Sequence, residues 1–511
     1  MVASCDCCCL EVWFPPVAWK RALIVALHKK GDRAVPGNWR GISLLSIPGK
    51  VYAMLIMRRL RDQIDGQLHE AQCGFRPHRG TTDAMFTLRQ LVDMCRAGNS
   101  PLCAAFIDLA KAYDSVTRAA LWSVLALFNV HPKIVALLED LHTGTTAALR
   151  MDGDIGPSFA VDSGVRQGCV IAPMLFNVYM DYMLQQALSR MQSEFGEDCG
   201  VGVFVQECLQ SLAAILYADD MVLVSHCPAQ LTRMLVILDE VACGMGLSIN
   251  ADKTKILLFD KSGALQQHFA AHPVVLSGGR VQVVDRFKYL GSWLCSSGTL
   301  DDEVGCRKAR VYAAMSALDG VWRNRHLNLA CKVAAYKCFV LPHFMYGAES
   351  WNATSQHEHM LEVVQNNCMR RLLQVTLRDR HSVDHMRRVC GLQSIQLLLA
   401  KCRLRWAGHV ARMPASRLPH AVLFGKLRAP AAPRAGRPPM SFKQALARGA
   451  EACGICKQPN VEFVHTISGL AQDKGSYRAL LAGLSLLPSR QTRAASVHHM
   501  ATRSRAAGTG S

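Results

Sequence analysis

Residues 212–225, LAAILYADDMVLVS, constrain the fold more than any other part of the chain. Two apolar runs flank an Ala-Asp-Asp step, which is typical of two strands joined by a tight turn. The pattern therefore predicts a β-hairpin with Asp219 and Asp220 at its tip. An aspartate at a turn is commonly a solvated or capping residue, so this hairpin alone does not indicate any chemistry.

A second carboxylate follows another apolar run. Residues 102–108, LCAAFID, are predicted to form a short buried strand that ends at Asp108. If this strand and the hairpin are neighbours in one sheet, the three carboxylates converge. Phosphoryl transfer by two divalent cations about 3.5–4 Å apart needs such ligands, and Mg²⁺ prefers oxygen.

The remaining pattern alternates between short strands and longer helices. Helices are predicted after Pro48, from Thr117, over 170–190 and from Leu231 to Gly244. Residues 22–27 are an apolar run in a partly extended segment, 256–259 are predicted to be a strand, and 287–294 a further hairpin. In the first of these helices, Val51, Met54 and Leu55 share one face. Residues 302–345 have a helical and basic pattern. After Arg417 the chain is expected to loosen, and residues 427–440 are predicted to be a Pro/Arg-rich linker.

The charge is concentrated at one end of the 511 residues. The formal net charge is +19, and residues 401–511 contain 18 Lys and Arg against 3 Asp and Glu. Such a polycationic segment favours binding to nucleic-acid phosphates, although a purely solubilising role is the alternative. No apolar stretch is long enough to span a bilayer, and the N-terminus does not resemble a signal peptide. We therefore expect an intracellular protein, in the nucleus or the cytoplasm, with no membrane partner and with mostly reduced cysteines.

Several segments in order resemble one known family. They are FIDLAKAYDSV (106–116), SGVRQGCVIAPMLFNVYMD (163–181), LYADDMVLVS (216–225), LSINADKTKILLF (247–259) and FKYLGSWL (287–294). Upstream, residues 29–51 and 72–85 are similar to motifs of its fingers region, and 341–351 with 405–414 are similar to the region that follows the polymerase. The chain is identified as a member of the reverse transcriptases. The sequences of its motifs are most similar to those of non-LTR (LINE-type) retrotransposons. No endonuclease motif accompanies the polymerase motifs.

The resemblance implies an α+β fold with the right-hand polymerase architecture. Residues 15–295 would form the fingers and the palm with its antiparallel sheet, and residues 296–352 the helical thumb. A Cys-rich segment (1–14) would precede them. A helical basic region (353–426) and a Pro/Arg-rich linker with a basic, partly disordered tail (427–511) would follow.

The resemblance also implies residue roles. Asp108, Asp219 and Asp220 would hold two Mg²⁺ ions, with Mn²⁺ as a possible substitute, and Lys253 would protonate the departing pyrophosphate, with Lys255 as a competing assignment. Tyr113 would exclude the 2′-hydroxyl of ribonucleotides. Lys30 and Arg40 would bind the triphosphate, and Gln167 and Gly168 would approach the nucleotide and template. Asp114 is expected to be structural.

The implied activity is RNA-directed DNA synthesis, in which an RNA template and a DNA primer are the partners and dNTPs the substrates. The alternative is a catalytically inactive nucleic-acid-binding remnant, and an intron-encoded maturase is a third reading. Neither Cys5, Cys7, Cys8 and Cys9 nor Cys453, Cys456 and His465 supply a clear set of four zinc ligands.

Overall fold

The computed structural model describes residues 15–29, 31–151, 153–205, 207–428, 439–455 and 463–485. Contacts within the chain divide it into two compact units. The first contains residues up to Ala84, Ser100–Leu290 and Leu427–Pro430, and the second contains Met85–Asn99, Gly291–Lys426 and the residues from Ala431 onward. Helix α3 (Thr81–Ala97) begins in the first unit and continues in the second.

The first unit is built around a five-stranded sheet with the strand order β13-β10-β3-β9-β8. The strands are β3 (Leu102–Ile107), β8 (Ala214–Tyr217), β9 (Asp220–Ser225), β10 (Lys255–Phe259) and β13 (Gln282–Val284). All neighbours are antiparallel except β10 and β13, which run parallel. Every residue of the central strand β3 is buried, as its uninterrupted apolar sequence requires.

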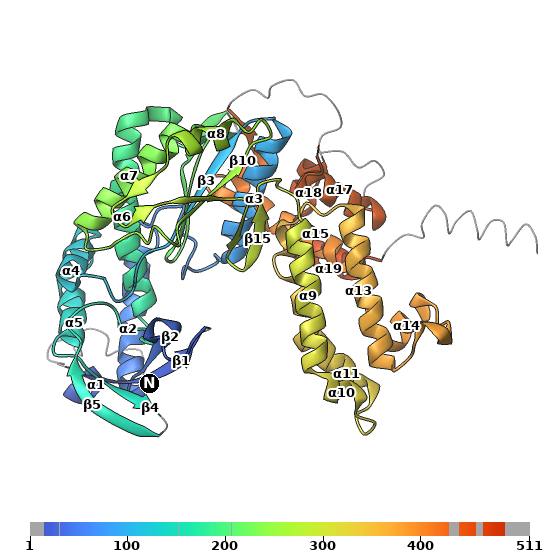
Figure 1. Ribbon diagram of the computed structural model, residues 1–511, viewed down its shortest axis with the longest axis horizontal. Helices are drawn as coiled ribbons and strands as arrows, with labels where there is room; N and C mark the ends of the chain where they lie inside the picture. Colours follow the sequence, from blue (N-terminus) through green and yellow to red (C-terminus); the bar gives the residue numbers. More distant parts are fainter. Residues whose placement is uncertain are drawn as a thin grey trace, which may run out of the picture. The chain divides into compact units, whose positions relative to one another are not determined.

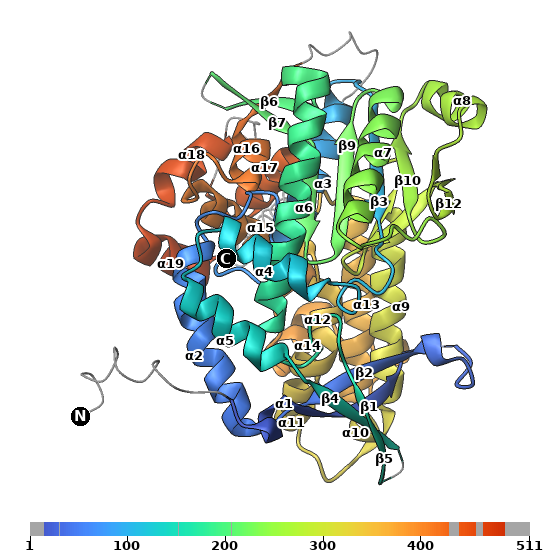
Figure 2. The ribbon, with the colours of Figure 1, turned by 90° about the vertical axis from the view of Figure 1, so that its left-hand side faces the viewer.

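Helices cover this sheet. Helix α7 (Pro228–Gly244) packs against β9 and β3, and α6 (Ala172–Phe195) packs against α7 (Figure 2). The expected helices after Thr117, over 170–190 and from Leu231 are all present, the first as α4 (Arg118–Leu127). Further elements of the first unit are α5 (Pro132–His142), β6 (Val201–Val205), β7 (Cys208–Leu212), α8 (Ala264–Ala271), β11 (Val275–Leu276), β12 (Gly279–Arg280) and β14 (Arg286–Tyr289).

A second sheet in the first unit has the order β2-β1-β4-β5. It consists of β1 (Arg21–His28), β2 (Trp39–Leu44), β4 (Thr146–Met151) and β5 (Asp154–Ala160), preceded by the short helix α1 (Val17–Lys20). Strand β1 is antiparallel to β2 and parallel to β4.

Helix α2 (Ile47–Ile64) has two faces with apolar residues, of which only one is buried. The helix forms where the pattern predicted it, but Val51, Met54 and Leu55 are exposed. Its buried positions are instead Gly49, Ala53, Ile56, Leu60 and Ile64, which also recur at helical spacing.

The second unit is helical around one apolar core that includes Trp322, Trp351, Tyr336 and Phe344. Helices α9 (Asp301–Ala317) and α13 (Ser355–Leu373) lie side by side in it (Figure 1). After its part of α3, the next element of the unit is strand β15 (Ser292–Cys295). It continues with α10 (Asp319–Arg323), α11 (Leu329–Ala335), a π-helical turn (Tyr336–Val340), α12 (Leu341–Met345), α14 (Val383–Cys390), α15 (Ile395–Ala411) and α16 (Leu418–Phe424).

The described residues beyond Arg417 contain more helix than the composition indicated. Besides α16, helices α17 (Phe442–Ala452), α18 (Phe463–Leu470) and α19 (Lys474–Gly483) form, and α17, α18 and α19 pack against α15. The reason is visible in α17, where Phe442, Ala445, Leu446 and Ala450 form a buried stripe among small residues. Most of the predicted linker, and the chain after residue 485, lie outside the described residues.

Candidate active site

Two neighbouring strands bring the predicted carboxylates to one edge of the five-stranded sheet. Strand β3 pairs with β9, and the last pair in the register is Ile107 with Met221. Continued by one residue beyond this pair, the register would bring Asp108 opposite Asp220, where directly opposed residues have Cα atoms about 4.5–5.5 Å apart. The charge of Asp108 acts on the Asp220 carboxylate, as this arrangement requires. Asp219 precedes Asp220 in the turn between β8 and β9.

The three carboxylates influence one another electrostatically. The pKa of Asp220 is raised to about 6. Partial burial is the largest cause, and repulsion from the charges of Asp219 and Asp108 adds to it. The pKa of Asp219 is also raised, by burial and by the charge of Asp108. Both residues remain exposed at the tip of the turn, so solvent screens part of this repulsion. The cluster therefore repels added negative charge and would be stabilised by a cation.

The backbone of Asp108 is fixed by the loop that follows α7. Asn250 donates its N–H to the carbonyl of Asp108 at 2.8 Å, and Asp108 donates its own N–H to the hydroxyl of Thr254 at 3.3 Å. The same loop carries Lys253, whose Nζ lies 3.2 Å from Oδ2 of Asp108. The competing residue, Lys255, donates instead to Oε1 of Gln282 at 2.7 Å. The structure thus brings Lys253 to the acidic cluster and directs Lys255 to another partner.

Tyr113 also lies near the acidic turn. Its ring stacks on Phe176, with centroids 4.2 Å apart and planes inclined by 12°. Burial raises the pKa of the Tyr113 phenol, and the charge of Asp219 raises it further. The ring is therefore held in one orientation beside the carboxylates.

Arg40 lies on strand β2 and is exposed. Its positive charge opposes the upward shift of the Asp219 pKa, which places the guanidinium within electrostatic reach of the turn. Lys30 lies outside the described residues. Burial raises the pKa of Asp114, and the charges of Lys111 and of Lys29, the neighbour of Lys30, oppose that rise. Lys29 is thus a cation near the site that the sequence did not single out.

The loop with Gln167 and Gly168 closely approaches the second sheet. Ser43 donates its N–H to the carbonyl of Gln167 at 2.8 Å. Gly168 has a φ of +114°, and a Cβ there would lie 2.3 Å from the carbonyl oxygen of Ser43. A cavity of about 210 Å³ lies beside this contact, and Gln167, Ser43, Gly41 and Asp114 contribute to its lining.

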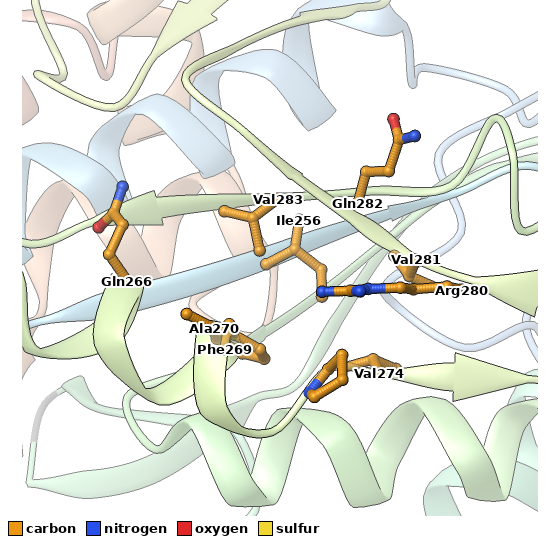
Figure 3. Close-up of a pocket in the computed structure, with 10 residues that line it drawn as sticks. Ile256, Gln266, Phe269, Ala270, Val274, Arg280, Val281, Gln282 and Val283 are labelled. Atoms are coloured by element: carbon orange, nitrogen blue, oxygen red, sulfur yellow. The ribbon is translucent and has the colours of Figure 1, made fainter.

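A larger cavity, of about 450 Å³, lies away from these residues, between α8 and strands β10 and β13 (Figure 3). Phe269 and Ile256 form part of its apolar lining, and Arg280 supplies a cation. None of the predicted site residues lines it.

Further residues at the site were not singled out from sequence. Gln72 and Gly74 contact the acidic turn, and Thr254 contacts Asp108. Residues 72–85 carried a motif resemblance, but no local spacing links Gln72 to a turn 146 positions away.

The described residues were also compared with the side-chain groups that bind metal ions without a substrate. Within the described ranges, no three His, Cys, Asp or Glu side chains form a group that could by itself hold a metal ion. Cys453 is buried, whereas Cys456 and the N-terminal cysteines lie outside the described residues. Among the helices that can be described, none has both the length and the apolar character needed to cross a bilayer.

Comparison with known proteins finds a family model that matches this sequence. A family model described as reverse transcriptase (RNA-dependent DNA polymerase) matches residues 27–294, more than half of the chain. A probable RNA-directed DNA polymerase from transposon BS of Drosophila melanogaster is 26% identical over 79% of this chain and 43% of its own length. The polyprotein of the type-1 retrotransposable element R2 of Popillia japonica is 23% identical over 67% of this chain and 46% of its own length. Among solved structures, apo telomerase from Candida tropicalis aligns with a TM-score of 0.42 and 10% identity, over 93% of this chain and 71% of that one. The chain spans less than half the length of both retroelement relatives.

Proposed function

This chain belongs to the reverse transcriptase (RNA-dependent DNA polymerase) family, and from that premise we propose that it extends a DNA primer along an RNA template. The substrates would be dNTPs, and the source a non-LTR retrotransposon, which the similarity to transposon BS and element R2 supports. The observation that carries the proposal is the pairing of β3 with β9, which brings Asp108, just after the end of β3, near Asp220 at the start of β9, where its charge acts on both Asp219 and Asp220.

Asp108, Asp219 and Asp220 would hold the metal ions of this reaction, with Mg²⁺ as the expected metal and Mn²⁺ as a substitute. Their mutual repulsion, which raises the pKa of Asp219 and Asp220, fits a site that accepts cations. Mg²⁺ is usually bound by one or two carboxylates together with substrate phosphates and water, so a protein-only group of ligands is not required. When bound, two such ions activate the attacking 3′-hydroxyl and neutralise charge on the triphosphate.

The other residues would bind and orient the nucleotide. Arg40 carries a guanidinium suited to bidentate phosphate contacts, and Lys30 would assist it. Tyr113, held against Phe176, would leave no room for a 2′-hydroxyl. The Gln167-Gly168 loop would position the nucleotide and the template base.

Lys253 would act on the leaving group. Its ammonium lies beside Asp108, so it is within reach of a pyrophosphate leaving the acidic cluster. Proton transfer from a positioned lysine to that leaving group is general acid catalysis.

Primer extension tests the proposal. The full chain is incubated with an RNA template, an annealed DNA primer, dNTPs and Mg²⁺, and compared with Asp219→Asn and with Asp154→Asn, an exposed aspartate on β5. We expect extension by the wild type and by Asp154→Asn, dependence on the metal, and loss of extension in Asp219→Asn. Binding of template and primer without extension by the wild type would instead favour an inactive remnant.

A further inference from the structure

The turn that carries the acidic pair has a strained backbone. Ala218, immediately before Asp219, has a φ of +59° and is buried. A residue with a Cβ in this left-handed region costs about 1–2 kcal/mol. Such a conformation persists only when the surrounding structure holds it.

Gln72 supplies the contact that holds this turn. Its side chain is fully buried, and its Oε1 accepts hydrogen bonds from the N–H of Ala218 at 3.1 Å and from the N–H of Gly74 at 2.9 Å. Because both groups are donors, they require an oxygen and thereby fix the orientation of the amide. The amide nitrogen of Gln72 has no hydrogen-bond partner among the residues that the structure describes.

The backbone around Gln72 runs beside the hairpin. Cys73 donates its N–H to the carbonyl of Leu216 at 2.8 Å, and Leu216 donates its N–H to the carbonyl of Ala71 at 2.9 Å. Gly74 fits against the turn because it lacks a side chain: a Cβ there would lie 2.3 Å from the backbone nitrogen of Ala218.

Helix α6 holds this loop in turn. The side-chain amide of Asn177 donates to the carbonyl of Gly74, and the buried carboxylate of Asp181 accepts the N–H of His69 at 2.9 Å. Residues 69–74 thus connect a long buried helix to the acidic turn.

We propose that Gln72 is a positioning residue for Asp219. The Gln72 side chain acts by holding the backbone of Ala218 in its left-handed conformation. This inference rests on the proposed polymerase function, since the position of Asp219 matters only if its carboxylate takes part in the reaction. A displacement of about 1 Å at a reacting centre can reduce the rate about 100-fold. A glutamine that merely fills the core would affect folding stability and leave the chemical step unchanged.

Three variants of the full chain separate these roles. Gln72→Met keeps the length of the side chain and removes the acceptor, whereas Gln72→Glu keeps the oxygen that receives both N–H groups. Gln90→Met is the matched control, because Gln90 is a buried glutamine on α3 in the second unit, whereas the acidic turn belongs to the first.

Two measurements are made on each variant. Hydrogen–deuterium exchange of the segment containing Ala218 reports on the contact without requiring catalysis, and single-turnover nucleotide incorporation reports on its consequence. In Gln72→Met we expect exchange at the turn to accelerate on the order of tenfold. We expect the incorporation rate to fall about 100-fold with little change in the apparent affinity for dNTP. Gln72→Glu should restore most of both properties, and Gln90→Met should change neither.

Each other outcome overturns the inference. Unchanged exchange at the turn in Gln72→Met would show that the contact does not hold it, and faster exchange with an unchanged rate would show that the turn does not need it. If Gln72→Met does not fold, Gln72→Glu alone decides. A folded Gln72→Glu that keeps slow exchange at the turn but loses nucleotide incorporation would also contradict the inference. A wild type that incorporates no nucleotide, but whose turn loses protection in Gln72→Met, would refute the proposed function. The hydrogen bond between Gln72 and Ala218 would then be a structural contact only.

Discussion

Lys253 and Asp108 form an ion pair in which Nζ of the lysine lies 3.2 Å from Oδ2 of the aspartate. They are 145 positions apart in the sequence, and the loop that carries the lysine also bonds to the backbone of Asp108 on both sides of its Cα. The pair is exposed, so its contribution to stability is small and its interest is chemical.

Replacing Lys253 tests its role as a proton donor. Lys253→Gln should reduce the single-turnover incorporation rate about 100-fold, the lower part of the range for general acid catalysis. Lys255→Gln is the control, because Lys255 donates to Gln282, and should change the rate little. Equal losses in the two variants would show that neither lysine has a specific role in the chemical step.

The acidic cluster predicts how stability depends on pH. The pKa of Asp220 rises from its ordinary value of 3.8 to about 6 in the folded protein, so the folded state binds a proton more tightly than the unfolded state. The corresponding stability is fully present below pH 3.8 and is lost as the pH rises to about 6. Asp220→Asn should therefore raise the melting temperature at pH 7.5 and have little effect near pH 4. A melting temperature that falls at pH 7.5 would contradict the repulsion.

Tyr113 predicts sugar selectivity. Its ring is held by stacking on Phe176, so Tyr113→Phe should keep both the stack and the preference for dNTP over rNTP. Tyr113→Ala should open space for the 2′-hydroxyl and reduce the preference by about 10–200-fold. The measurement is the ratio of kcat/KM for dGTP to that for GTP. An unchanged ratio in Tyr113→Ala would exclude the steric role.

Replacing Gly168 should have a steric effect on the Gln167 loop in addition to the backbone strain of a side chain at positive φ. Gly168→Ala places a Cβ 2.3 Å from the carbonyl oxygen of Ser43 and should separate the Gln167 loop from β2. Gly144→Ala is the control, since Gly144 also has a positive φ, +63°, but has no atom within 4 Å of the added Cβ. We expect a marked loss of nucleotide incorporation only in Gly168→Ala, whereas both variants lose about 1 kcal/mol or more of stability.

The sequence predicted the elements whose signal is local. The apolar runs around Asp219 and before Asp108 were confirmed as strands, and the α+β class was confirmed with them. The apolar periodicity of α7 was likewise sufficient to predict the helix, because one face of that helix is buried. The expected segment boundaries and the roles of the site residues stay predictions.

Other features depend on distant parts of the chain. The exposed face of α2 could not be distinguished from its buried face, because Val51 and Ile56 are both apolar and only the tertiary neighbours decide which is covered. The helices after Arg417 were not predicted. The buried face of α17 consists largely of alanine, and next to a segment rich in Pro and Arg such a face gives little hydrophobic signal in the sequence. Gln72 begins a segment with a motif resemblance, but its contact with the turn could not be predicted, because its partner Ala218 lies 146 residues away.

The account depends on Asp108 and Asp219 acting as one unit, and a double-mutant cycle measures this most directly. Single-turnover incorporation is determined for the wild type, Asp108→Asn, Asp219→Asn and the double variant under the same concentration of Mg²⁺. If the two carboxylates belong to one catalytic cluster, the double variant loses no more activity than the worse single variant. Losses in ΔΔG that add in the double variant would show that the two aspartates act independently, and would contradict the account.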